Sequence, residues 1–155
     1  MYLTGNYERT LDAKLRLTLP AQWKGDLTGD GGDRGTEPSS TLCLIPMPDA
    51  IYGFTPEAHR SWVDSRFPGG FDPTDKKMDR LRRYLAQSTL TVDVDKAGRV
   101  CLGKLGEEKL ARLGIQKEVE VIGNIDHFEI WNREKFQVEM EEIYDEELSQ
   151  LLFSM

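Results

Sequence analysis

The stretch TLDAKLRLTLP, residues 10–20, recurs in altered form 83 positions later as DVDKAGRVCLG, residues 93–103. In both copies an Asp precedes an Arg by four residues, and a Lys lies between them. Apolar residues alternate beyond each Arg, a pattern typical of a strand with one buried face. Each copy therefore predicts a tight charged turn between two strands. The shared charged residues are Asp12, Lys14 and Arg16 in the first copy and Asp95, Lys96 and Arg99 in the second.

The repeat is longer than the turn. Each copy continues with a short helix-compatible stretch, an apolar strand-like run, a second such run that ends in an aromatic residue, and a helix start. The order strand–turn–strand–short helix–strand–strand–helix therefore occurs twice, which predicts a duplicated module. Thr55 and Asn132 suit the N-caps of the two closing helices. The paired segments are 21–27 and 104–114, 40–46 and 118–123, and 49–54 and 126–131.

Two segments lie outside the repeat. Residues 28–40 are rich in Gly, Asp and Ser without periodicity, which predicts a flexible inserted loop. Residues 67–88 predict a helix that joins the halves, with Asp72 as its cap and Pro73 in its first turn. The basic residues between 76 and 83 leave two interpretations open: a solvated face of a docked helix, or a surface that faces DNA.

The charge is unevenly distributed over the 155 residues. The chain has a formal charge of −7, and residues 134–155 contribute −6 of it through seven acidic residues and one lysine. Apolar residues recur at helical spacing in the same segment, which predicts an acidic amphipathic helix. Its apolar stripe packs either on the chain's own core or on a neighbouring subunit. The remaining body is nearly neutral with cationic turns, so the overall acidity does not exclude a DNA-binding protein.

Composition and motifs exclude several classes of protein. No apolar run approaches the roughly 18–20 residues of a membrane span, and the N-terminus lacks the features of a secretory signal. Cys43 and Cys101 share no metal-type spacing, so we expect reduced thiols in a cytoplasmic protein, with a disulfide between them as the alternative. His59 and His127 have no second ligand at zinc-site spacing. With no nucleophile or nucleotide-binding motif either, we expect no catalytic site, metal, cofactor or small-molecule substrate.

The chemistry of the repeated turn is compatible with two interpretations, anion binding and a solvated hairpin. An Asp at the base of the turn can accept hydrogen bonds from backbone N–H groups, or pair with the guanidinium of the Arg and fix its orientation. A guanidinium presented in this way can bind a phosphate, or contact guanine with a discrimination of roughly 1–3 kcal/mol. The alternative is a solvated hairpin whose ion pair contributes roughly 0–1 kcal/mol to stability.

Three segments resemble the MraZ family of bacterial transcriptional regulators, in the AbrB-like swapped-hairpin superfamily: GNYERTLDAKLRLTLPAQW (5–23), STLTVDVDKAGRVCLG (88–103) and LARLGIQKEVEVIGNIDHFEIWNREKF (110–136). The resemblance implies a mainly β fold with helices (α+β), in which two tandem AbrB-like half-barrel modules form one pseudo-twofold double-psi, or swapped-hairpin, barrel. The expected parts are the first module (1–66), the linking helix (67–88), the second module (89–133) and the C-terminal helix (134–155).

The resemblance also implies a function. Members of this family assemble into ring-like homo-oligomers and bind direct repeats in the promoter of the division and cell-wall gene cluster, usually as repressors. It implies a cytoplasmic, nucleoid-associated protein whose partners are double-stranded promoter DNA and further copies of itself. Arg16 and Arg99 would contact phosphates or bases, Asp12 and Asp95 would shape the loops, and Arg9 would add a backbone contact. The implied DNA-binding residues are Arg9, Asp12, Lys14, Arg16, Asp95, Lys96 and Arg99.

The chain departs from the family pattern at two positions. Leu15 stands where the family has Gly before the first Arg, although Gly98 keeps that residue in the second copy. A non-glycine residue in a left-handed conformation costs roughly 1–2 kcal/mol, so we expect the first turn to differ in shape from the second. Gly103 stands where the second copy normally has Pro, the counterpart of Pro20. The alternative function is a scaffold that binds no DNA and holds a protein partner through its C-terminal helix.

Overall fold

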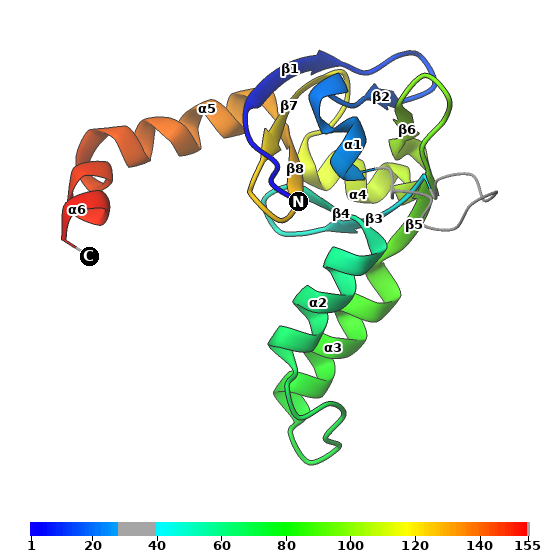
Figure 1. Cartoon of the computed structure of the whole chain (residues 1–155), viewed down its shortest axis with the longest axis vertical. Helices are drawn as coiled ribbons and strands as arrows, with labels where there is room; N and C mark the ends of the chain where they lie inside the picture. Colours follow the sequence, from blue (N-terminus) through cyan, green and yellow to red (C-terminus); the bar gives the residue numbers. More distant parts are fainter. Residues whose placement is uncertain (28–39, 155) are drawn as a thin grey trace.

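The computed structural model describes residues 1–27 and 40–154, apart from the side chains of residues 145 and 146. The loop expected at 28–40 therefore lies outside the described residues, except for Ser40. The two halves contain the same elements in the same order (Figure 1). The first half contains β1 (Asn6–Thr10), β2 (Arg16–Thr18), η1 (Ala21–Trp23), α1 (Lys24–Leu27), β3 (Thr41–Pro46), β4 (Ile51–Phe54) and α2 (Pro56–Arg66). The second half contains β5 (Leu90–Asp93), β6 (Arg99–Cys101), η2 (Leu102–Leu105), α4 (Glu107–Leu113), β7 (Glu118–Gly123), β8 (Phe128–Asn132) and α5 (Arg133–Glu142).

The strand order shows that the two halves exchange strands. Six strands form one antiparallel sheet in the order β1-β7-β8-β4-β3-β5, and β2 pairs with β6 in a separate ribbon. If each strand is replaced by its counterpart in the other half, the same strand order is obtained, read in the opposite direction. β1 therefore pairs with the second half, and β5 with the first. The expected α+β fold, with two modules interleaved in one pseudo-twofold swapped-hairpin barrel, is confirmed.

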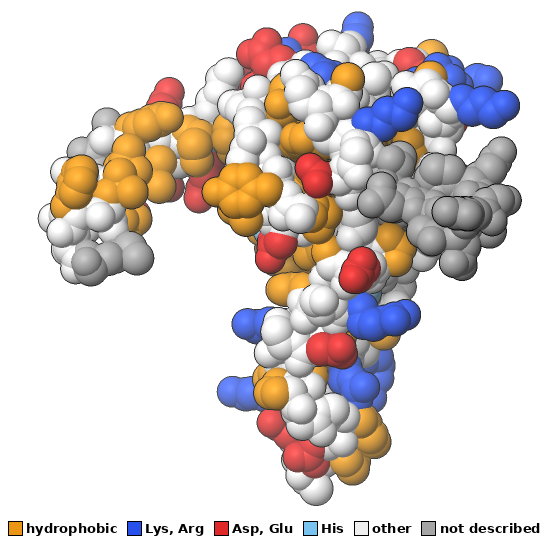
Figure 2. All heavy atoms as spheres, in the orientation of Figure 1, with side chains coloured by type: hydrophobic (Ala, Val, Ile, Leu, Met, Phe, Trp, Pro, Cys, Tyr) orange, Lys and Arg blue, Asp and Glu red, His pale blue; other side chains and the backbone are white. Residues whose placement is uncertain are grey.

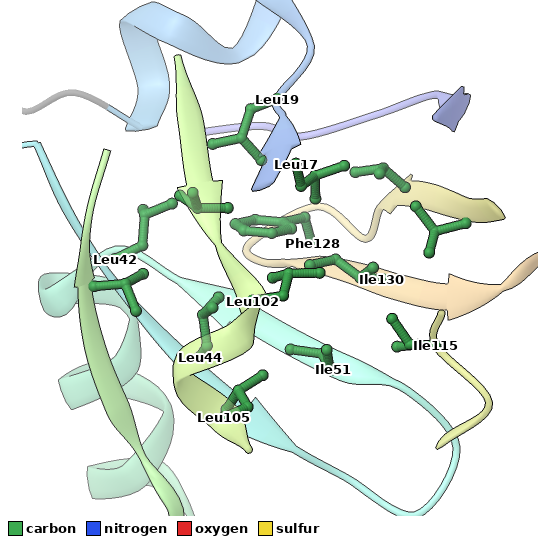
Figure 3. Close-up of a cluster of buried hydrophobic side chains, with 14 of the residues drawn as sticks. Leu17, Leu19, Leu42, Leu44, Ile51, Leu102, Leu105, Ile115, Phe128 and Ile130 are labelled. Carbon is green, nitrogen blue, oxygen red and sulfur yellow. The ribbon is translucent and has the colours of Figure 1, made fainter. Parts of the chain in front are cut away.

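The core lies between the curved sheet and the β2–β6 ribbon, and both halves contribute to it (Figure 3). Leu17 and Val100 occupy the inner face of the ribbon and are fully buried. Phe128 packs beneath them, and its ring lies so close to Gly53 that an added Cβ there would be 2.2 Å from the ring carbon Cζ. Neither half could bury these apolar faces alone, which explains in physical terms why the module occurs twice.

Helices α2 and α3 (Lys76–Ser88) form a hairpin that projects from the barrel (Figure 1). Leu81 and Leu85 of α3 belong to one apolar cluster with Trp62 and Phe67. The N-cap of α3 is Asp75, which accepts a hydrogen bond from the backbone N–H of Met78 at 3.2 Å. The prediction that Asp72 caps this helix is therefore wrong.

The helix caps show why that prediction fails. The Asp72 carboxylate accepts from the backbone N–H and the hydroxyl of Thr74, so it closes the turn before the helix. The predicted caps of the closing helices are confirmed, since Thr55 accepts from the backbone of Ala58 and Asn132 from that of Lys135.

The C-terminal segment differs from the single helix expected for 134–155. Helix α5 passes into a π-helical turn, η3 (Ile143–Glu147), and then into α6 (Leu148–Phe153), with a change of direction. Its base packs on the barrel, where Phe136 contacts Trp131 and Met140 packs against the same cluster. We call α5, η3 and α6 the arm.

None of the helices within residues 1–27 and 40–154 combines the length and apolarity that a membrane span requires. Cys43 and Cys101 are both free thiols, so the alternative of a disulfide between them is not realised.

Candidate nucleic-acid interface

The first charged turn is organised by the carboxylate of Asp12. Its Oδ1 accepts hydrogen bonds from the backbone N–H groups of Lys14 and Arg16, both at 2.9 Å. Its Oδ2 accepts from Nε of Arg16 at 2.6 Å. One side chain therefore closes the turn and at the same time fixes the orientation of the guanidinium.

The second turn repeats these contacts. Asp95 Oδ1 accepts from the backbone N–H groups of Ala97 at 3.0 Å and Arg99 at 2.9 Å, and Oδ2 accepts from Arg99 Nε at 2.9 Å. The Arg16 and Arg99 side chains are 32% and 34% exposed. Among the described residues neither guanidinium has a further protein partner for its two terminal nitrogens. Both arginines thus present two N–H₂ groups outward in the same geometry.

Leu15 adopts the backbone conformation that the family pattern assigns to glycine. Its φ is 59°, close to the 78° of Gly98 in the second turn. The expectation that Leu15 changes the shape of the first turn is therefore wrong. The Leu15 side chain packs against the core, and an added Cβ at Gly103 would lie 3.7 Å from its Cδ1. The two departures from the family pattern are thus in contact, and apolar packing of Leu15 offsets its backbone strain.

Reciprocal hydrogen bonds hold the two turns together. The backbone N–H of Leu102 donates to the carbonyl of Leu15, and that of Leu19 donates to the carbonyl of Gly98, both at 2.9 Å. Each turn therefore accepts a hydrogen bond from the residue directly after the strand that follows the other turn. Sequence analysis missed this coupling, because the contact joins residues more than 75 positions apart.

The ribbon register places both arginines on one face. Arg16 pairs with Cys101, and Arg99 pairs with Thr18. Side chains of directly paired residues point to the same side, so all four share the outer face, opposite the buried Leu17. Two residue steps along a strand and one step across give about 8 Å between the Cα atoms of the two arginines. This span matches roughly two base-pair steps of duplex DNA.

The remaining predicted cations surround this face. Lys14 and Lys96 are exposed, and neither has an ion-pair partner among the described residues. Figure 2 shows Lys and Arg side chains gathered over the region of β2 and β6. We call the two turns with Lys14, Arg16, Lys96 and Arg99 the twin-turn surface.

Arg9 lies beside this surface with a different role. Its Nε donates to the carbonyl of Thr18 at 3.1 Å and its Nη1 to the carbonyl of Glu8 at 3.0 Å. The guanidinium also lies 5.5 Å from the ring centre of Tyr7. Two of its three guanidinium nitrogens therefore donate within the protein, and the bond from Nε joins β1 to the end of β2.

The pKa values of both turn aspartates are below their usual range. For Asp12 and Asp95 the main cause is the backbone hydrogen bond from the Arg four residues later, opposed by desolvation and reinforced by the guanidinium itself. Both carboxylates are ionised at neutral pH. Their contribution to stability is therefore present above the usual pKa of Asp and is lost as the pH falls through the lowered one.

A second charged cluster, between β7 and β8, escaped the sequence analysis. His127 pairs with Glu129 at 2.8 Å and with Asp126 at 2.9 Å, and its ring lies 5.1 Å from those of Tyr52 and Phe54. Burial lowers the pKa of His127, but hydrogen bonds to the two carboxylates outweigh it and raise the pKa above its usual value. The His127 ring packs on aromatic rings and Glu129 is buried, so we assign the cluster to stability.

The described residues offer no arrangement for the other chemistries considered. No group of three His, Cys, Asp or Glu side chains within 1–27 and 40–154 is placed to hold a metal ion. The basic helix α3 projects away from the β2–β6 ribbon (Figure 1). A DNA segment bound on the twin-turn surface would therefore not reach α3 without strong bending, which favours the interpretation as a solvated face.

Comparisons with known proteins identify relatives of the chain by sequence. No family model matches the chain. A transcriptional regulator MraZ from Mycoplasmopsis pulmonis is 31% identical over all of the chain and 95% of its own length. Proteins of the same name from Oleidesulfovibrio alaskensis and Burkholderia vietnamiensis are 30% and 31% identical over 88% and 82% of the chain. With its duplicated swapped-hairpin barrel and this similarity over its whole length, the chain belongs to the MraZ family.

Proposed function

We propose that the chain is a sequence-specific DNA-binding transcriptional regulator that contacts double-stranded promoter DNA through the twin-turn surface. The observation that carries this proposal is the matched geometry of Arg16 and Arg99. Each is held at Nε by an Asp, and each turns its terminal nitrogens to the same outer face. Such a fork suits a phosphate or the O6 and N7 of guanine.

In this proposal the residues of the surface have different tasks. Arg16 and Arg99 contact the DNA, and Lys14 and Lys96 add phosphate contacts. Asp12 and Asp95 position the arginines without contacting DNA. Arg9 acts mainly by holding β1 on the ribbon, with one remaining nitrogen for a backbone contact.

One barrel offers few cations, so it should bind DNA weakly. We propose that a ring-like homo-oligomer presents several twin-turn surfaces to direct repeats in the promoter of the division and cell-wall gene cluster. Linked sites raise affinity by roughly 10²–10⁴ without new contacts. Binding there would block transcription, so the protein would act as a repressor, in the cytoplasm and associated with the nucleoid.

The proposal is tested by fluorescence-anisotropy titration with DNA from upstream of the protein's own gene. Wild type is compared with Arg16→Ala/Arg99→Ala at several salt concentrations. Each phosphate contact that is lost should lower the slope of log affinity against log salt by about 0.9. We expect tight, salt-sensitive binding by the wild type and a large loss in the double variant.

The matched control is Lys109→Ala/Arg112→Ala, which removes two exposed basic side chains of α4. It changes the net charge equally but leaves the twin-turn surface intact. Equal losses in both double variants would contradict the proposal, because they would show a general charge effect.

The exposed apolar face of the arm favours a second candidate, a scaffold that binds no DNA and holds a protein partner. Partner binding by such a scaffold would be unchanged by Arg16→Ala/Arg99→Ala but weakened by Met140→Glu or Leu148→Glu. A folded, oligomeric wild type without DNA affinity would support this candidate over the regulator.

A further inference from the structure

The outer face of the β2–β6 ribbon has a twofold symmetry that the side chains follow only in part. The register of the ribbon is unchanged when each residue is replaced by its counterpart 83 positions away. The pseudo-twofold axis therefore passes through the central pair, Leu17 and Val100, perpendicular to the outer face. A protein with exact twofold symmetry reads palindromic DNA. A preference for a box with a direction must therefore come from residues that break the symmetry.

The four cations of the twin-turn surface do not supply such a direction. Arg16 and Arg99 are symmetry counterparts, and each is held at Nε by the Asp of its own turn. They offer the same contact to both halves of a box. Counted from the Asp, Lys14 is the third residue of its turn and Lys96 the second. In their proposed role both contact phosphates, which are present for either direction of the DNA and carry no sequence information.

Two short side chains complete the outer face, and they differ chemically. Cys101 lies beside Arg16 and Thr18 beside Arg99, so each arginine has a different neighbour. Thr18 is exposed, and its hydroxyl has no hydrogen-bond partner among the described residues. Cys101 is half-buried, and its thiol donates weakly to the carbonyl of Lys14 at 3.6 Å. The sulfur therefore offers mainly an apolar surface, whereas Thr18 offers a free hydroxyl.

The position of these two side chains suits contact with bases. A two-stranded ribbon is narrow enough to enter the major groove with one face toward the base edges. Each guanidinium is held toward its own turn, and the two turns lie at opposite ends of the ribbon. The space between them is left to Thr18 and Cys101. A threonine hydroxyl can bond a base edge, and an apolar group suits the methyl group of thymine.

We propose that Thr18 and Cys101 are the residues that give each DNA box its direction. One half of the box is read by Arg16 together with the thiol of Cys101, and the other half by Arg99 together with the hydroxyl of Thr18. The box is then not a palindrome, and each barrel binds it in one orientation. Repeats can be direct only if the box has a direction, so this inference deepens the proposed function and rests on it.

The test determines how the full-length protein is oriented on the promoter repeats. A photoreactive benzoylphenylalanine at Ala13 marks the first turn, and mapping of the crosslinked base gives the end of the box that this turn occupies. In the wild type we expect one end to exceed the other by about fivefold or more, the ratio for one base contact. The exchange Thr18→Cys/Cys101→Thr should move the crosslinks to the opposite end, because it exchanges the chemistry of the two halves.

The single variants make the outer face symmetric. With Cys101→Thr or Thr18→Cys, crosslinks from Ala13 should fall equally at both ends of the box. Selection from a pool of random duplexes should then enrich a palindromic box, whereas the wild type should enrich a directional one. Thr4→Cys, at an exposed position outside the ribbon, is the matched control and should behave like the wild type. All samples are kept reduced, so that no thiol is oxidised.

Circular dichroism and anisotropy titration establish that each variant is folded and binds DNA. Folded variants that bind DNA with the orientation of the wild type would overturn this inference alone, because another residue would then set the direction. Equal crosslinking at both ends by the wild type would also overturn it. A wild type that binds no DNA would overturn the proposed function together with the inference.

Discussion

Leu15 offers a sharp test of the turn geometry, because the usual ranking of alanine and glycine should reverse there. At ordinary backbone positions glycine is less stabilising than alanine by roughly 0.5–1 kcal/mol. At Leu15, with φ of 59°, any residue with a Cβ carries a strain of roughly 1–2 kcal/mol that glycine avoids. We therefore expect Leu15→Gly to be more stable than Leu15→Ala by about 1 kcal/mol.

The packing of the Leu15 side chain determines how stable both variants are relative to the wild type. Leu15 is half-buried against the core, so removing its side chain costs about 1 kcal/mol, roughly half of the value for full burial. Leu15→Ala should therefore lose this amount of unfolding free energy relative to the wild type. Leu15→Gly should regain most of that loss, because it relieves the backbone strain. For a chain of this size 1 kcal/mol corresponds to about 2–4 °C in Tm.

Thermal unfolding at equal protein concentration measures this difference. Ala86→Gly, at an exposed position inside α3, is the matched control and should lose about 1 kcal/mol. A Leu15→Gly variant less stable than Leu15→Ala would refute the left-handed geometry of the first turn, and with it the equivalence of the two turns.

Three further predictions concern the packing of the core, the aspartates of the two turns and the charge of His127. Gly53→Ala should lose about 3 kcal/mol or more of unfolding free energy, measured in urea, because the new Cβ would overlap the Phe128 ring; full stability would contradict the packing. Asp12→Ala and Asp95→Ala should each weaken DNA binding roughly tenfold in anisotropy titrations, although losing a negative charge alone would strengthen it; tighter binding would exclude a positioning role. The difference in Tm between wild type and His127→Gln should be largest below about pH 6.5 and should decrease as the pH rises through the raised pKa of His127. A difference that stays constant with pH would show that the charge of His127 does not contribute to stability.

Much of the fold could be predicted because the duplication is local in sequence. The Asp and Arg of each turn lie four residues apart and their hydrogen bonds stay within the turn, so one motif predicts one conformation. The N-caps Thr55 and Asn132 were predictable for the same reason. The family resemblance then implied how the two modules combine.

The remaining features depend on contacts between distant residues. The first turn keeps its shape despite Leu15 because the side chain packs against a core that both halves of the chain supply. Asp72 was expected as a cap because it precedes a proline, but the hydroxyl of Thr74 competes for its carboxylate. The apolar period of the C-terminal segment did not show the π-helical turn that redirects α6.

The central claim is that the twin-turn surface meets DNA. A photoreactive benzoylphenylalanine at Ala13 or Ala97, one exposed residue of each turn, tests this contact directly on repeat-containing promoter DNA. Ser65 on α2 and Gln150 on α6 serve as exposed control positions. The account predicts crosslinks to DNA from both turns and none from the controls. Crosslinks from Ser65 without any from Ala13 or Ala97 would contradict it.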